Sequence, residues 1–99
     1  MNGLTEKERF FLDHLEFENL TAGEGIPKAF PARNWLRDHR VFEDEIYILI
    51  SIRSWERRTL MHELPEQPFE PPWKDGNEAR QRSRELGPVL KAMEEEGQA

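Results

Sequence analysis

The chain has 99 residues, enough for one small domain with a single core and too few to add a deep substrate cavity. Apolar residues make up 36% and charged residues 34%, yet six Phe and three Trp argue against a disordered chain. The absence of Cys excludes disulfides and Cys-based zinc sites, and the formal net charge of −6 disfavours nonspecific attraction to nucleic acid or anionic lipid.

Residues 5–20 are predicted to form the first helix. Thr5 and Glu8 have the spacing of a capping box, in which each side chain accepts a hydrogen bond from the other residue's backbone N–H. The apolar residues of this helix fall on two opposite sides, Phe11, Leu12 and Leu15 on one and Phe10, Phe17 and Leu20 on the other. A surface helix needs one apolar stripe. Either this helix lies between two elements of its own fold, or its second stripe faces another chain.

Residues 31–40 are predicted to form a short second helix after a connection rich in Gly and Pro. Arg33, Arg37 and Arg40 recur at i, i+4 and i+7, which places three guanidinium groups on one stripe. This is the one concentrated positive region of the sequence. The candidate contacts to an anion or a nucleic acid are Lys28, Arg33, Asn34, Arg37 and Arg40.

Residues 43–64 hold the densest apolar stretch and are predicted to form a central third helix. Within it, Ile46–Arg53 alternates like a strand, but a strand would need to pair with a copy of itself in a dimer, because no second convincing strand is present. The length of the periodic stretch favours a helix, as do the acids Glu43–Glu45 in its first turn. That helix also has two apolar faces: Phe42, Ile46 and Leu49 belong to a broad one, and Ile48, Ile52 and Trp55 form the other.

Residues 65–74 are rich in proline and are predicted to be extended, and residues 76–96 to form a C-terminal helix interrupted at Gly87-Pro88. The proline-rich segment has the spacing of a groove-binding PxxP ligand, but any proline-rich linker produces that spacing by chance. We interpret the segment as a strap that lays Phe69 and Trp73 over the helices. The sequence therefore predicts a single all-α domain, a small bundle of about four helices with a proline-rich strap before the last.

No pattern in the sequence indicates an enzyme. His14 and Glu18 lie one helical turn apart, as in some metal sites, but a second pair is missing. The carboxylates are spread as solvated charge, and no serine lies in a strained nucleophile turn. We expect no catalytic residue, no metal and no cofactor.

Binding of a protein partner fits the sequence better than catalysis does. The second apolar faces and the aromatic residues are the kinds of group that dominate interfaces, and the negative charge would steer the chain towards a basic partner surface. Small acidic inhibitors of nucleic-acid-handling machinery, including phage-encoded ones, work in this way, an analogy of class only. The candidate partner-binding residues are Phe10, Phe17, Leu20, Ile48, Ile52, Trp55, Phe69 and Trp73.

Two alternatives remain. The first is a helix-turn-helix-like DNA-binding regulator that uses the arginine stripe, and the second is a homodimeric structural or adaptor protein. The first residues lack the order of a signal peptide, and no run reaches the roughly 18 apolar residues that span a bilayer. We therefore expect a soluble, cytoplasmic protein without a membrane partner.

Overall fold

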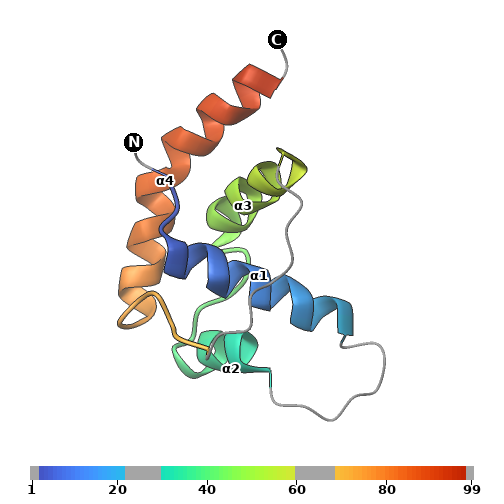
Figure 1. Cartoon of the computed structure of the whole chain (residues 1–99). Helices are drawn as coiled ribbons and strands as arrows, with labels where there is room; N and C mark the ends of the chain where they lie inside the picture. The colour runs from blue at the N-terminus through green and yellow to red at the C-terminus, as the bar shows by residue number, and fades with distance from the viewer. Residues whose placement is uncertain (1–2, 22–29, 60–68, 98–99) are drawn as a thin grey trace.

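The computed structural model describes residues 3–21, 30–59 and 69–97, and within them the chain forms four helices and no strand. The helices are α1 (Glu6–Thr21), α2 (Pro31–Asp38), α3 (Tyr47–Thr59) and α4 (Gly76–Gly97). In Figure 1, α1 runs through the middle, with α3 and α4 on one side of it and α2 on the other. Helix α1 packs against α2 and α3, and α3 packs against α4. The prediction of an all-α fold is confirmed.

Phe11 on α1 is the centre of the aromatic part of the core. It is fully buried, and its ring centroid lies 5.8 Å from that of Trp35, 5.7 Å from that of Phe69 and 4.9 Å from that of Trp73. Residues 69–74, the described part of the proline-rich segment, thus place the rings of Phe69 and Trp73 against Phe11 of α1. Residues 65–68 of the predicted strap lie outside the described residues.

The capping box at the start of α1 is confirmed. The Thr5 N–H donates to Glu8 Oε1 over 2.8 Å, and the Glu8 N–H donates to Thr5 Oγ1 over 3.1 Å. These two bonds satisfy backbone donors that the first turn of a helix leaves without a partner. Helix α1 begins at Glu6, one residue after the capping threonine.

Three carboxylates of α1 are buried, and each one holds a different part of the fold. Glu8 is 2% exposed, Asp13 5% and Glu18 4%. Because the residues are spaced by five positions, successive side chains point about 140° apart around the helix. The prediction that the carboxylates are solvated charge is wrong for these three.

Glu8 joins the start of α1 to α4 and to the segment that precedes α4. Its Oε2 accepts hydrogen bonds from Arg82 Nε at 2.7 Å and from Trp73 Nε1 at 3.1 Å. Burial raises the pKa of the Glu8 carboxyl group, but the hydrogen bonds from Arg82, the Thr5 N–H and Trp73 outweigh burial. The pKa of Glu8 is therefore lower than its ordinary value, and Glu8 is ionised at neutral pH.

Asp13 joins α1 to α3 through a buried pair with Arg53. Arg53 Nε donates to Asp13 Oδ1 and Arg53 Nη2 to Asp13 Oδ2, each over 2.7 Å, while the two side chains are 3% and 7% exposed. Two parallel bonds of this kind fix both distance and orientation. The hydrogen bond to Asp13 raises the pKa of Arg53, so that the guanidinium group is charged inside the protein.

Glu18 fixes the start of α2. Its Oε1 accepts a hydrogen bond from the Ala32 N–H at 3.0 Å, and its Oε2 accepts one from the Arg33 N–H at 3.1 Å. Phe30, the N-cap residue of α2, makes no capping hydrogen bond with its own side chain. A carboxylate from α1 therefore supplies the cap and compensates the positive end of the α2 dipole.

The third helix begins later than predicted. Residues 43–46 form turns, and α3 begins at Tyr47 instead of residue 43. The Glu45 N–H donates to the Phe42 carbonyl at 2.9 Å, and the Glu45 carboxylate forms an ion pair with Arg80 of α4. This contact with α4 holds the acidic run in a tight entry turn, although the same acids would suit a first helical turn. The predicted end at residue 64 lies outside the described residues.

The strand alternative for Ile46–Arg53 is wrong, because Ile46 lies in the entry turn and the rest of the stretch in α3. The second apolar face of α3 is covered within the chain. Ile52 is 2% exposed, and Ile48 and Trp55 pack against the core. The ring of Trp55 lies against Gly97, where an added Cβ would collide with it.

Helix α4 continues through Gly87 and Pro88, so the predicted interruption does not divide it. Pro88 removes one backbone donor. On either side of it, Leu86 and Leu90 are buried in the core. Packing of these flanking residues offsets the lost hydrogen bond and keeps one helix.

Two glycines of α4 provide a matched test of this packing. A Cβ on Gly76 would lie 2.6 Å from the His39 carbonyl oxygen and 2.8 Å from Val41 Cγ2, whereas a Cβ on Gly87 would meet Ile48 Cδ1 at an ordinary 3.6 Å. We expect Gly76→Ala to lower the free energy of unfolding by about 1–3 kcal/mol through overpacking. Gly87→Ala should change it by less than about 1 kcal/mol, because the gain in helix propensity is opposed by the contact of the new Cβ with the ring of Pro88. Urea unfolding followed by circular dichroism measures both; equal effects would contradict the close approach at Gly76.

The buried Glu8 predicts a specific dependence of stability on pH. A carboxyl group whose pKa is lowered by folding stabilises the protein above its unfolded pKa of about 4.3, and this contribution is lost as the pH falls through the folded pKa. We expect the free energy of unfolding of wild type to fall more steeply below pH of about 4.3 than that of Glu8→Gln. Urea unfolding between about pH 3 and 7 tests this. Parallel curves for the two proteins would contradict it.

Candidate functional site

Helix α2 ends in an unusual turn that shapes the surface beside it. The Arg40 N–H donates to the Arg37 carbonyl at 3.0 Å, and the Val41 N–H donates to the Leu36 carbonyl at 2.8 Å. Arg40 has φ of 55°, and no other described residue apart from glycine has a positive φ. Glycine is the residue usually found at this position of a helix end. The predicted helix over residues 31–40 therefore ends at Asp38, and Arg40 adopts the left-handed conformation instead of continuing the stripe.

A hollow of about 540 Å³ opens beside this turn. We call it the Phe42 hollow. Its lining comprises Arg33, Leu36, Arg37, Arg40, Val41, Phe42 and Glu43. The side chain of Phe42 is 67% exposed, the highest value among the large hydrophobic residues that the structure describes. An apolar surface edged by three arginines is the most distinctive exposed feature in the described part of the chain.

The three arginines differ in how far they are neutralised. Arg33 forms an ion pair with Glu43 at 2.7 Å. Arg37 lies 3.7 Å from Asp38, but both side chains are largely exposed and such a pair contributes little. The Arg40 side chain has no ion-pair partner among the described residues. Arg37 and Arg40 therefore keep most of their positive charge for a ligand.

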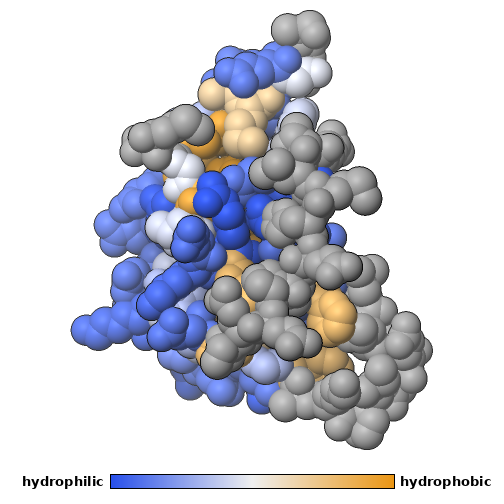
Figure 2. All heavy atoms as spheres, in the orientation of Figure 1, coloured by the Kyte–Doolittle hydropathy of each residue, from blue (hydrophilic) through white to orange (hydrophobic). Residues whose placement is uncertain are grey.

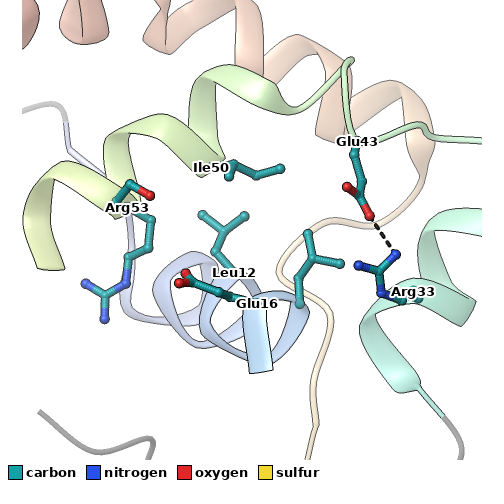
Figure 3. Close-up of a pocket in the computed structure, with 8 residues that line it drawn as sticks. Leu12, Glu16, Arg33, Glu43, Ile50 and Arg53 are labelled. Carbon is teal, nitrogen blue, oxygen red and sulfur yellow. Dashed lines mark hydrogen bonds and ion pairs between the residues drawn. The ribbon is translucent and has the colours of Figure 1, made fainter. Parts of the chain in front are cut away.

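A second, smaller hollow adjoins the first, and we call it the central hollow (Figure 3). Its volume is about 140 Å³. Arg33 and Glu43 line it too, together with Leu12, Leu15, Glu16, Ile50, Arg53 and Ser54. In Figure 3, Leu12 of α1 and Ile50 of α3 point towards one another, while the Arg33–Glu43 ion pair closes the side next to α2. The ion pair thus forms a wall shared by the two hollows.

Phe42 was missed as a candidate because the sequence placed it on a buried face of a longer third helix. The turn at residues 43–46 removes it from that helix and leaves it in solvent. The sequence does carry one signal. Phe42 follows the arginine stripe directly and is separated from the isoleucines by three acids, so it need not share their environment.

Most of the predicted partner-binding residues are used inside the fold. Trp73 is 5% exposed, Phe10 9% and Ile52 2%, while Ile48, Trp55 and Phe69 pack against the core. Phe17 is 54% exposed. The side chain of Leu20 lies outside the described residues. The second face of α3 therefore requires no foreign partner, whereas on the second face of α1 Phe10 is buried and Phe17 is exposed. The main argument for a partner moves to the Phe42 hollow.

The predicted anion contacts are only partly brought together. Arg33, Arg37 and Arg40 line one hollow, and Asn34 is half-buried on α2 outside that lining. Lys28 lies outside the described residues. One of the acids that follow the arginines neutralises one of them, since Glu43 forms an ion pair with Arg33.

His14 and Glu18 do not act together as a pair of ligands. His14 Nδ1 lies 3.1 Å from the Phe10 carbonyl and its ring contacts Phe69, while Glu18 caps α2. Among the described residues, no group of three or more His, Asp or Glu is placed to hold a metal ion.

On the face of the molecule in Figure 2, the described residues show mainly hydrophilic atoms, with hydrophobic atoms in small separate areas. None of the described helices is long and apolar enough to cross a membrane. No protein-family model, curated protein or solved structure matches this chain, so its function can be inferred only from its own residues and their geometry.

The left-handed conformation of Arg40 gives a direct prediction. The left-handed conformation costs a non-glycine residue about 1–2 kcal/mol, and glycine removes that cost. Glycine also makes the unfolded chain freer, which lowers stability by about 0.4–1 kcal/mol and cancels part of the gain. We expect Arg40→Gly to raise the free energy of unfolding by up to about 1 kcal/mol. Arg37→Gly, inside α2 where φ is helical, should lower it by about 1 kcal/mol. Chemical unfolding of both variants checks the contrast, and a loss of stability in Arg40→Gly would contradict it.

Proposed function

We propose that this protein is a non-enzymatic binding protein that takes an acidic, amphipathic segment of a protein partner into the Phe42 hollow. The observation that carries the proposal is the position of the 67% exposed Phe42 in an apolar hollow edged by Arg33, Arg37 and Arg40. Aromatic and arginine side chains are enriched at the centres of protein interfaces. A role as regulator or inhibitor of the partner is part of the same proposal.

The charge of the hollow favours an acidic ligand over the basic partner surface that the net charge of −6 suggests. Field strength near a site depends on nearby groups, because charges beyond about 10 Å are largely screened at ordinary salt. Arg37 and Arg40 are exposed charges that line the hollow. Arg37 has only a weak, solvent-exposed pair with Asp38, and Arg40 has no ion-pair partner among the described residues. A ligand with carboxylates beside an apolar side chain complements both parts.

The apolar lining favours a protein over a nucleic acid. Leu36 and Val41 are buried beneath the hollow, 4% and 3% exposed, and offer aliphatic surface to an aliphatic or aromatic side chain. The arginines and the exposed Phe42 would also suit phosphates and a stacked base. DNA or RNA binding is therefore an outcome for the test to decide.

The test uses a display library of random 16-residue peptides selected on the purified full chain, with enriched peptides then measured by fluorescence anisotropy. We expect enrichment of Asp or Glu next to large apolar residues, and binding that weakens with salt. Phe42→Ala should weaken binding about tenfold or more. Tyr47→Ala is the matched control, since Tyr47 is 59% exposed but lies outside the lining of the hollow. It should change affinity by less than about twofold.

Three results would overturn the proposal. The first is the absence of enriched acidic peptides, or peptides that bind Phe42→Ala as well as wild type. The second is salt-steep binding of mixed duplex or single-stranded DNA that is lost in Arg37→Glu, which would assign nucleic acid to the arginines. The third is a dimer in light scattering that Phe42→Ala dissociates, which would assign the hollow to a second copy of this chain.

A further inference from the structure

We infer that the Phe42 hollow and the central hollow are two halves of one binding groove. In this groove Glu43 forms an ion pair with Arg33, and a carboxylate of the ligand competes with Glu43 for Arg33. This inference rests on the proposed function and specifies how the same site takes its partner. The geometric basis is that Arg33 and Glu43 line both hollows and are joined by an ion pair of 2.7 Å (Figure 3). The wall between the hollows therefore includes the ion pair between these two side chains.

This wall is easily opened. The side chain of Glu43 is 52% exposed and that of Arg33 33% exposed, so the pair lies in partly solvated surroundings where it contributes little to stability. A ligand carboxylate that replaces Glu43 restores the same kind of bond to Arg33 and returns Glu43 to water. Arg33 itself is held in place by its backbone, since its N–H donates to the buried Glu18.

The two hollows differ in what they accept. The Phe42 hollow, at about 540 Å³, is large enough for one face of a helical turn. The central hollow, at about 140 Å³, matches one apolar side chain, and Leu12, Leu15 and Ile50 provide its apolar lining. The ligand class is thus an acidic segment with an apolar side chain on each side of a carboxylate. The carboxylate meets Arg33, and its neighbours enter the two hollows.

The experiment compares two variants with the same change of charge at adjacent positions. Glu43→Gln removes the competitor, whereas Asp44→Asn removes an exposed carboxylate that lines neither hollow. The probe is the tightest acidic 16-residue peptide from the display selection, measured by anisotropy. We expect Glu43→Gln to bind it about three- to tenfold more tightly than wild type, and Asp44→Asn to change affinity by less than about twofold.

Ser54 tests the central hollow independently. Its side chain is exposed and lines that hollow but not the Phe42 hollow, so Ser54→Trp would fill the space with little strain on the core. We expect Ser54→Trp to weaken binding of the peptide about tenfold. Tyr47→Trp places the same side chain at an exposed residue that lines neither hollow, and it should change affinity by less than about twofold. The urea midpoints of both variants, compared with wild type, separate loss of binding from loss of folding.

The outcomes distinguish this inference from the function on which it rests. If the peptide binds wild type and depends on Phe42, but Glu43→Gln behaves like Asp44→Asn or Ser54→Trp binds normally, the single groove is refuted and the Phe42 hollow remains. If no acidic peptide binds wild type, the proposed function and the single groove are both refuted. Tighter binding by Glu43→Gln with loss in Ser54→Trp supports both.

Discussion

The burial of three carboxylates on one helix is the constraint on which the other contacts of this fold depend. Glu8 holds Arg82 and Trp73, Asp13 holds Arg53, and Glu18 holds the first N–H groups of α2. Removing a charge from water is costly unless its partners are well placed, so these contacts penalise any arrangement that separates the pairs. Hydrophobic burial drives the helices together, while the carboxylates determine which side of α1 each neighbour takes.

The candidate site is positioned by the last of these contacts. Glu18 fixes the first turn of α2 through the Ala32 N–H. The helix ends at Asp38, and the left-handed turn at Arg40 follows. Arg80 then joins the two sides of that turn, since it donates to the Arg40 carbonyl at 2.6 Å and pairs with Glu45. Both ends of the segment that carries the arginines and Phe42 are therefore anchored to buried or half-buried groups on other helices. Because the backbone of this segment is anchored before a ligand arrives, binding does not need to order it, which lowers the entropic cost of association.

Local patterns predicted the parts of the fold that depend on neighbours in sequence. The capping box is an example, because its two residues are three positions apart and carry their own geometry. The start of α3 could not be found in this way, since the acids at 43–45 suit a helical first turn, whereas in the structure Glu45 accepts a hydrogen bond from the Phe42 N–H and pairs with Arg80, 35 positions away. Phe42 lies outside the helix that the sequence predicted for it, and its side chain is exposed.

The burial of the three carboxylates could have been predicted from the pattern of apolar residues on the first helix. A helix with apolar residues on two opposite sides leaves little surface for water, so acids between those sides are expected to be buried and paired. Which basic group meets each acid is a property of the tertiary arrangement: Asp13 and Arg53 lie 40 positions apart, and Glu8 and Arg82 lie 74 apart.

Two features that cost stability occur side by side at the candidate site. Arg40 holds a backbone conformation that glycine would adopt more easily, and two residues later Phe42 exposes an aromatic ring to water. Elsewhere in the described chain most local choices agree with the fold, although Pro88 lies inside α4 and Phe17 is exposed: the capping box closes α1, the aliphatic residues of α3 pack in or against the core, and the buried acids of α1 all accept hydrogen bonds. Sequences that are consistent at every other level tend to break local rules where function requires it. The coincidence of both exceptions beside the arginines is a reason, independent of the shape of the hollow, to place binding there.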